Sequence, residues 1–197
     1  DVARSFSQAA STYDRVAALQ RQVAEALLEK IPARVFSQIV DLGCGTGVVA
    51  AQLAKREGAE TVFGLDLAEG MLNFARHRFP QANLQWCGAD AESLPLSDES
   101  VELVFSSLAV QWCADFQQVC NEIMRVLKPG GYCLLATLGP DTLRELRSAW
   151  QQVDGFVHVN RFINAEQVTR AALNAGFAGE CWQEDVVMRY QELRQLT

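Results

Sequence analysis

Short apolar runs alternate with amphipathic stretches along most of the chain. Each apolar run is followed by turn residues and then by apolar positions at helical spacing, which distinguishes strand from helix. The pattern predicts strands at about 38–42, 61–65, 83–87, 101–106 and 131–137, and helices near 48–56, 69–78 and 116–127. Alternating strands and helices are typical of an α/β fold with a doubly wound, mostly parallel sheet.

Helical segments are predicted on both sides of this core. The first has an apolar face that ends before Pro32 and should pack on the sheet; its members are Val16, Leu19, Val23, Ala26, Leu27 and Ile31. Lys128-Pro-Gly-Gly should end one helix and turn the chain into the fifth strand. A helix near 165–175 and a strand-like stretch at 177–190 follow, before a short helical tail.

A glycine-rich turn follows the first strand, where residues Val40 to Gly47 read Val-Asp-Leu-Gly-Cys-Gly-Thr-Gly. Glycines permit positive backbone torsions and let main-chain amides approach a ligand. Asp41 stands near the carboxyl end of the strand, and ligands bind at that end of an open parallel sheet. The turn therefore indicates a nucleoside-containing cofactor, with a turn that binds no ligand as the alternative.

The glycine spacing decides between cofactors. A dinucleotide fingerprint needs Gly-x-Gly-x-x-Gly, and Val48 stands where the third glycine would be. The motif Asp-x-Gly-x-Gly-x-Gly instead resembles the first motif of class I S-adenosylmethionine-dependent methyltransferases. This resemblance implies a Rossmann-like fold, S-adenosylmethionine as cofactor and S-adenosylhomocysteine as product. It places these residues beside the cofactor: Asp41, Gly43, Cys44, Gly45 and Gly47.

Asp66 ends the second predicted strand, 19 residues after Gly47. At a gap of about 20 residues, an acidic side chain accepts hydrogen bonds from ribose hydroxyls in doubly wound folds. Asp66 could instead cap the next helix, so both interpretations stay open. Leu67 and Met71 are further candidate cofactor contacts, although a methionine on an amphipathic helix is equally well explained as core.

Two further strand ends carry candidate cofactor residues. The stretch Leu84-Gln-Trp-Cys-Gly-Ala-Asp resembles the third strand of the same methyltransferases. The resemblance implies that Asp90 hydrogen-bonds the adenine amino group and that the amide of Ala91 meets a ring nitrogen. Ser106, at the end of the fourth strand, completes the expected set.

The residues expected near the methyl acceptor resemble those of a narrower family. Phe105-Ser-Ser-Leu-Ala-Val-Gln-Trp-Cys-Ala lies where these enzymes place substrate-facing residues. With Leu19-Gln-Arg-Gln and Asn160-Arg161-Phe162, it resembles the carboxyl O-methyltransferases that act on malonyl-acyl carrier protein in biotin synthesis, over nearly the whole chain. A malonyl thioester of acyl carrier protein or coenzyme A is therefore the expected acceptor. Another small carboxylic acid and a non-catalytic cofactor-binding subunit are the alternatives.

Sheets of this family usually close with an antiparallel strand pair, so one strand at the carboxyl end is expected to be missing. The chain should form a single domain, 1–197, with an amino-terminal helical lid at about 1–31. Tyr13 lies in a stretch that resembles this lid and could close over cofactor and substrate, or simply anchor a surface helix.

The expected chemistry needs no catalytic base, because a carboxylate is already an adequate nucleophile at neutral pH. Alignment of the reacting atoms and exclusion of water would supply the rate. Arg161 could hold the free carboxylate through paired hydrogen bonds, and Gln111 and Trp112 could line the thioester channel. Arg161 could equally be a surface arginine, Trp112 a core aromatic, and His158 either a base or a positioning group.

Composition limits the remaining classes of function. The chain has 197 residues and is 49% hydrophobic, with no apolar run near the roughly 20 residues that span a bilayer. Six cysteines without a Cys-x-x-Cys pair, and only two histidines, predict no metal site and fit a reducing compartment. We therefore expect a soluble, cytoplasmic monomer.

The net charge of −7 bears on partners. It counts against nucleic acid, whose phosphates would require a basic stripe. Acyl carrier proteins are also acidic, so docking would need a local basic patch. Four arginines are available for it: Arg144, Arg147, Arg161 and Arg170.

Overall fold

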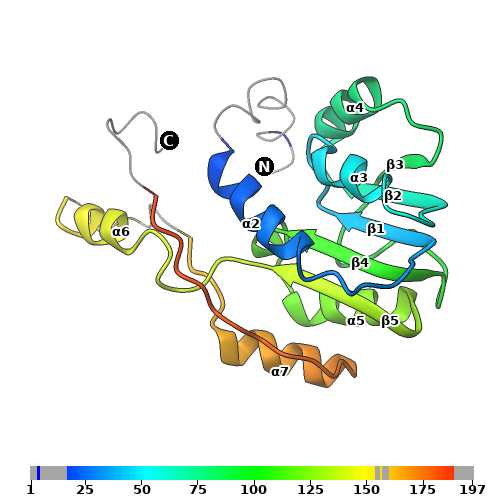
Figure 1. Ribbon diagram of the computed structural model, residues 1–197. Helices are drawn as coiled ribbons and strands as arrows, with labels where there is room; N and C mark the ends of the chain where they lie inside the picture. The colour runs from blue at the N-terminus through cyan, green and yellow to red at the C-terminus, as the bar shows by residue number, and fades with distance from the viewer. Residues whose placement is uncertain (1–3, 5–16, 154–155, 157–159, 189–197) are drawn as a thin grey trace.

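One parallel sheet organises the chain. The structure is a computed structural model that describes residues 4, 17–153, 156 and 160–188. Five strands pair in the order β3-β2-β1-β4-β5, all parallel (Figure 1). They are β1 (Gln38–Leu42), β2 (Thr61–Asp66), β3 (Leu84–Gly88), β4 (Val101–Ser107) and β5 (Leu127–Ala136). The doubly wound parallel sheet predicted from the sequence is confirmed.

Helices cover both faces of this sheet. In Figure 1, α2, α3 and α4 lie on one side, and α5 and α7 on the other. The helical elements are α2 (Ala18–Leu28), α3 (Val48–Leu53), α4 (Glu69–Arg78), the 3₁₀ turn η1 (Val110–Trp112), α5 (Phe116–Val126), α6 (Arg144–Gln151) and α7 (Ala165–Ala175).

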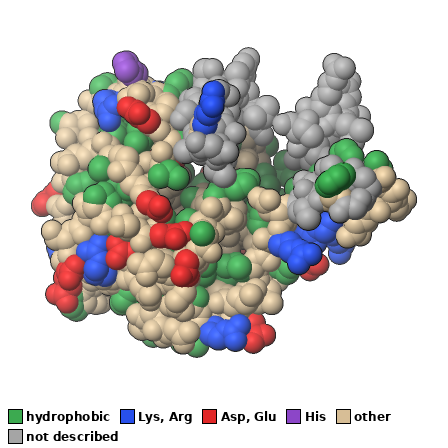
Figure 2. Space-filling model, turned by 180° about the vertical axis from the view of Figure 1, so that it is seen from behind, with side chains coloured by type: hydrophobic (Ala, Val, Ile, Leu, Met, Phe, Trp, Pro, Cys, Tyr) green, Lys and Arg blue, Asp and Glu red, His purple; other side chains and the backbone are tan. Residues whose placement is uncertain are grey.

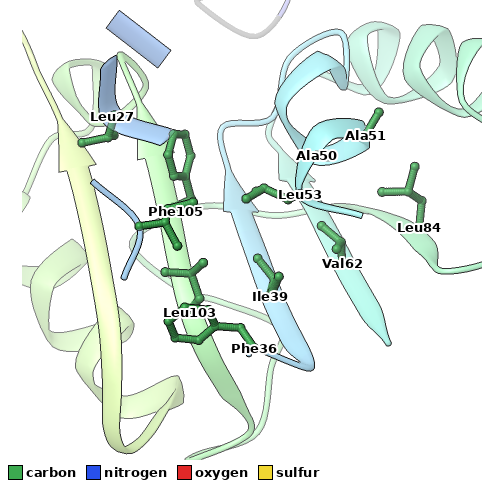
Figure 3. Close-up of a cluster of buried hydrophobic side chains, with 11 residues drawn as sticks. Leu27, Phe36, Ile39, Ala50, Ala51, Leu53, Val62, Leu84, Leu103 and Phe105 are labelled. Atoms are coloured by element: carbon green, nitrogen blue, oxygen red, sulfur yellow. The ribbon is translucent and has the colours of Figure 1, made fainter. Parts of the chain in front are cut away.

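The core consists of two apolar layers, one on each face of the sheet. Alternate residues of β4 supply them, since neighbouring side chains of a strand point to opposite faces. Leu103 and Phe105 join the layer under α2 and α3 (Figure 3), whereas Val104 packs against the layer under α5. Burial on both faces explains why the strands read as continuous apolar runs.

The α2 helix packs through a slightly different face from the one predicted. Ala24, Leu27 and Ile31 are buried, but Ala26 is exposed, so its assignment to the apolar face is wrong. Spacings of three and four residues place Ala24, Leu27 and Ile31 in one row, and Ala26 falls beside that row. Val16 lies outside the described residues.

Two element boundaries differ from the prediction by more than one residue. Helix α3 ends at Leu53, and the chain tightens into i to i−3 hydrogen bonds through Arg56 before Gly58 reverses it with a φ of +76°. Strand β5 already begins at Leu127, because the Lys128-Pro-Gly-Gly turn forms an irregularity within its pairing to β4. Gly130 adopts a φ of +75° in that turn.

The strand-like stretch 177–190 does not form a strand over its described part. Residues 177–188 lack regular structure and do not pair with β5, so this prediction is wrong for them. They leave α7 at Gly176, where a left-handed turn is closed by a hydrogen bond from the amide of Phe177 to Ala172. Alternating side chains stabilise a strand only when a neighbouring strand pairs with it. Residues 189 and 190 lie outside the described residues.

Gly64 should be required for the close packing of β2 against the ring of Trp86. A Cβ at this position would lie 2.4 Å from the ring of Trp86, so Gly64→Ala should lower the free energy of unfolding by about 1–3 kcal/mol. A Cβ at Gly88 would meet nothing within 4 Å, and Gly88→Ala should change stability by less than about 0.5 kcal/mol. Urea unfolding followed by circular dichroism would measure both. Equal stability of the two variants would contradict this packing.

Candidate active site

The glycine turn is fixed to the second strand by main-chain hydrogen bonds. The amides of Gly43 and Cys44 both donate to the carbonyl of Leu65, at 2.8 and 3.0 Å. Gly43, Gly45 and Gly47 have φ values of +75°, +52° and +83°, a region that side-chain-bearing residues rarely adopt. The motif therefore folds as one rigid turn between β1 and α3.

The three glycines differ in what surrounds them. A Cβ at Gly43 would lie 2.1 Å from the Cβ of Ala109, and one at Gly47 would lie 2.5 Å from the ring of Trp86. A Cβ at Gly45 would meet nothing within 4 Å. The main chain at Gly45 thus faces open space, which fits close approach of a cofactor.

Asp66 links the turn to the end of β2. Its Oδ2 accepts a hydrogen bond from the amide of Gly45, and its Oδ1 accepts one from Ala68, both at 2.8 Å. Helix α4 begins after Ala68 without a side-chain cap, so the interpretation of Asp66 as a helix cap is wrong. Each carboxylate oxygen can accept a second bond, which leaves capacity for ribose hydroxyls.

The electrostatics of Asp66 reflect these contacts. Burial raises the pKa of its carboxyl group, while hydrogen bonds from the amides of Ala68, Gly45 and Leu67 lower it. Leu67 itself is 61% exposed and stands beside this carboxylate at the sheet edge.

Asp41 is the buried acid of the site. Its side chain is 3% exposed, and Oδ2 has no hydrogen-bond partner. Its pKa is raised from 3.8 to about 7, chiefly by burial and also by the charge of Asp66, although a hydrogen bond from the amide of Ala50 lowers it. An unpartnered buried carboxylate oxygen is costly, and a hydrogen-bond donor on a bound cofactor would satisfy it. Asp41 therefore fits the cofactor role expected from the sequence.

The loop after β3 lies next to the end of β2. The amide of Ala89 donates to the carbonyl of Asp66 at 3.0 Å, and the exposed carboxylate of Asp90 accepts from the amide of Glu92 at 2.9 Å. Ala91 is half-buried beside them. The structure thus brings the expected ribose and adenine residues to one edge of the sheet.

Three other residues expected at the cofactor have side chains that are buried or hydrogen-bonded inside the protein. Met71 is 1% exposed, which favours its interpretation as core. Cys44 is 8% exposed, and burial, with the nearby charges of Asp41 and Asp66, raises the pKa of its thiol, so that its backbone and not its sulfur is suited to a ligand. The buried hydroxyl of Ser106 donates to the carbonyl of Leu42 at 2.8 Å and joins β4 to β1.

Ser107, which the sequence analysis did not single out, has a buried hydroxyl without a partner. The alternation of side chains along a strand could have indicated Ser107, because Ser106 and Ser107 must point to opposite faces of the sheet. The next residue, Leu108, has a φ of +51°, an uncommon conformation for leucine. The backbone at the end of β4 is therefore strained beside the glycine turn.

The expected acceptor residues of η1 follow directly. Gln111 donates through Nε2 to the carbonyl of Leu108 at 2.6 Å, and its buried Oε1 has no partner. Trp112 is 45% exposed, so its interpretation as a core aromatic is wrong. Arg161 is exposed in the segment that leads into α7. Tyr13 and His158 lie outside the described residues, and their roles stay predictions.

The described residues hold no group of three or more His, Cys, Asp or Glu side chains suited to a metal ion, and all six cysteines are free thiols. None of the described helices has the length and apolarity to cross a bilayer.

Comparisons with known proteins agree with this geometry. A family model described as a methyltransferase domain matches residues 40–135. The chain is 50% identical to the biotin biosynthesis bifunctional protein BioHC of Cellvibrio japonicus, over 100% of this chain but only 39% of that protein. It is 43% identical to the malonyl-acyl carrier protein O-methyltransferase of Serratia marcescens, over 99% of this chain and 74% of that protein.

A solved structure is similar as well. Phosphoethanolamine N-methyltransferase 2 of Haemonchus contortus, in complex with S-adenosyl-L-methionine, superposes with a TM-score of 0.69 at 26% identity. The match covers 87% of this chain and 41% of that one.

Removing the Asp66 carboxylate should abolish cofactor binding. Asp66→Ala should raise the Kd for S-adenosylmethionine at least about a hundredfold, because bonds to a charged acceptor contribute about 1.5–3 kcal/mol each. Isothermal titration calorimetry would measure this. Asp98→Ala is the control, since Asp98 is 75% exposed and bonds Arg125 instead of the turn. Full affinity in Asp66→Ala would remove Asp66 from the site.

The buried Asp41 should make stability depend on pH. Its pKa is raised to about 7 on folding, so the folded protein binds more protons than the unfolded chain between about pH 4 and pH 7. As the pH rises from about 4 to about 7, the free energy of unfolding of the wild-type protein should therefore fall by a few kcal/mol relative to that of Asp41→Asn. Above this window the difference should level off. Urea unfolding of both proteins at several pH values would measure it. Parallel pH profiles would contradict the assignment.

Proposed function

Since the chain belongs to the S-adenosylmethionine-dependent methyltransferases, as a relative of the malonyl-acyl carrier protein O-methyltransferases, we propose that it methylates the free carboxylate of a malonyl thioester in biotin synthesis. Its cofactor is S-adenosylmethionine. The observation that carries the proposal is the position of η1, whose Gln111 and Trp112 stand after β4 while Ala109 touches the glycine turn. An acceptor lined by η1 would meet the cofactor at that turn.

Binding and orientation account for the chemistry. The cofactor supplies an electrophilic methyl group on a sulfonium centre. Asp66 would orient the ribose, Asp90 and Ala91 would hold the adenine edge, and Asp41 with the open main chain at Gly45 would receive the remainder. The malonyl carboxylate is ionised at neutral pH, so no residue has to remove a proton. Alignment of the two reactants and exclusion of water then provide the acceleration.

On the acceptor side, Arg161 would hold the malonyl carboxylate through two parallel hydrogen bonds. Gln111 would contribute its unpartnered Oε1, and Trp112 would lie along the thioester arm. Tyr13 would close the site as part of an amino-terminal lid at about 1–31 of a single domain, and His158 would position the acceptor.

Docking of an acidic carrier protein would use the α6 end of the molecule. Arg144 and Arg147 lie one turn apart on α6, and Figure 2 shows Lys and Arg side chains gathered at that end while Asp and Glu side chains dominate the opposite part. Arg144 is 71% exposed beside Glu145. A local basic surface of this kind can attract an acidic partner despite the net charge of −7. Arg170 lies on α7, apart from α6 in the fold.

The proposal describes a monomer that acts in the cytoplasm without nucleic-acid or membrane partners. The acidic charge counts against nucleic acid, and the free cysteines fit a reducing compartment such as the cytoplasm.

A parallel assay tests this function. Release of S-adenosylhomocysteine is measured with malonyl-acyl carrier protein, malonyl-coenzyme A and free malonate. Faster turnover of either thioester than of free malonate supports the proposal, and preference for the carrier protein supports docking at α6. Cofactor binding without turnover of any malonyl compound overturns the proposal in favour of another acid or a silent subunit.

Arg161 should determine the affinity for the acceptor. Arg161→Ala should raise the KM for the malonyl acceptor about tenfold or more, because a carboxylate loses two charge-assisted hydrogen bonds, and leave the Kd of the cofactor unchanged. Arg161→Lys is the matched control, since it keeps the charge but loses the paired geometry and should restore only part of the affinity. Steady-state kinetics with unchanged KM in Arg161→Ala would remove this arginine from the pocket.

A further inference from the structure

The segment between β4 and α5 contacts both halves of the cofactor site. We call residues 108–115 the acceptor segment, because it carries Gln111 and Trp112. At one end Ala109 packs against Gly43, so closely that a Cβ on the glycine would lie 2.1 Å away. The segment is therefore held against the glycine turn at its amino-terminal end.

Glu92 holds the other end of the acceptor segment. Its Oε1 accepts hydrogen bonds from the amides of Ala114 at 2.6 Å and Asp115 at 3.1 Å. Its own amide donates to Asp90, the residue expected at the adenine edge. We call residues 89–92, which follow β3, the adenine loop; two of its residues, Asp90 and Glu92, thus connect the expected adenine carboxylate to the acceptor segment.

A thiol of the acceptor segment lies beside the same carboxylates. Burial, together with the charges of Glu92 and Asp90, raises the pKa of Cys113 to about 11. Cys113 directly follows Trp112, and the 2.6 Å hydrogen bond from the amide of Ala114 to Glu92 holds the acceptor segment against the adenine loop.

We propose that Glu92 is a positioning residue whose carboxylate couples the adenine loop to the acceptor segment, so that cofactor binding fixes Gln111 and Trp112 for the acceptor. The inference rests on the proposed function for the identity of the acceptor only. The coupling itself requires nothing but the cofactor.

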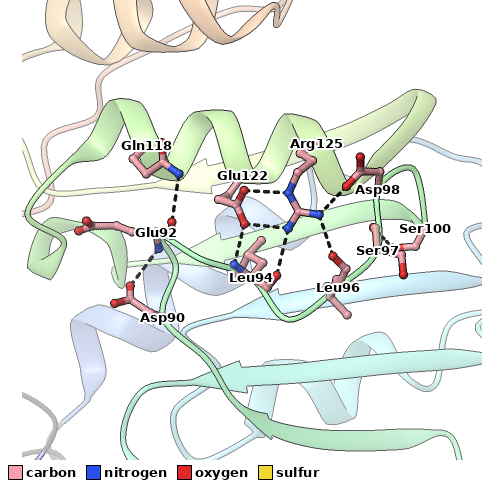
Figure 4. Close-up of polar contacts among 10 residues, drawn as sticks. All are labelled: Asp90, Glu92, Leu94, Leu96, Ser97, Asp98, Ser100, Gln118, Glu122 and Arg125. Carbon is pink, nitrogen blue, oxygen red and sulfur yellow. Dashed lines mark hydrogen bonds and ion pairs between the residues drawn. The ribbon is translucent and has the colours of Figure 1, made fainter.

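Each of the two structures that Glu92 joins also has anchors of its own. Helix α5 already has a cap, because the side chain of Asp115 accepts from the amide of Gln118 at 3.1 Å. The chain after Glu92 has separate anchors on α5, where Glu122 accepts from the amide of Leu94 and Arg125 donates to the carbonyls of Leu94 and Leu96 (Figure 4). What only the Glu92 carboxylate provides, among the described contacts, is the link to residues 114 and 115.

Hydrogen exchange tests the coupling without any acceptor. In the wild-type protein, saturating S-adenosylhomocysteine should slow exchange of the amides in residues 110–115 about tenfold, because their hydrogen bonds open less often. In Glu92→Ala this slowing should be lost, while the Kd for S-adenosylhomocysteine, measured by calorimetry, stays within about threefold of wild type. Glu92→Gln keeps an accepting oxygen and should restore most of the slowing.

Glu122→Ala is the matched control. It removes a carboxylate that also accepts from a main-chain amide of the same loop, at 2.7 Å, but does not reach the acceptor segment. It should lower stability yet leave the cofactor-induced slowing at 110–115 intact. Slowing that persists in Glu92→Ala, or that is lost equally in Glu122→Ala, overturns the proposal.

Kinetics separate this inference from the proposed function. With a malonyl acceptor, Glu92→Ala should raise the acceptor KM about tenfold while kcat changes less than about threefold, and Glu92→Gln should lie close to wild type. An unchanged KM contradicts the role of Glu92. Absence of turnover in the wild-type protein would contradict the proposed acceptor. The hydrogen-exchange experiment would still test whether Glu92 couples the cofactor to the acceptor segment.

Discussion

The hydrogen bond from the amide of Gly45 to Asp66, at 2.8 Å, joins the two strand ends on which the site depends. It ties the glycine turn after β1 to the carboxylate after β2, and the amides of Gly43 and Cys44 reinforce the junction through Leu65. Parallel pairing of β1 with β2 in register brings these ends together. A cofactor that bridges turn and carboxylate therefore meets groups that are already placed, and little ordering remains for binding to supply.

The order of the strands explains why the acceptor would arrive from the other side. The sheet runs outward from β1 in both directions, to β2 and β3 on one side and to β4 and β5 on the other. Ligands of open α/β sheets bind in the crevice where the order reverses. The adenine loop follows β3 and the acceptor segment follows β4, so β2 and β1 separate the two strand ends. Glu92 spans that gap with bonds to Ala114 and Asp115.

The spacing of residues along the chain predicted the features that depend on neighbouring residues, namely the strands and the glycine turn. Buried parallel strands are apolar throughout, and glycine spacing with a carboxylate 19 residues later reflects the turn itself, so the sheet and the grouping of Asp41, Asp66 and Asp90 could be read from the chain. Contacts between segments that are distant in sequence could not be predicted in this way. Ala26 missed the buried row of α2 by one helical position, residues 177–188 found no strand to pair with, and the link from Glu92 joins segments about 22 residues apart in sequence, which no periodicity indicates.

A crystal structure of the protein with S-adenosylhomocysteine tests the central claim most directly. The account predicts both ribose hydroxyls within about 3 Å of the Asp66 carboxylate, with the bond from Gly45 retained and the adenine edge at Asp90 and Ala91. A nucleoside bound away from the carboxyl ends of β1 and β2, or an Asp66 that still contacts only Gly45 and Ala68, would contradict it.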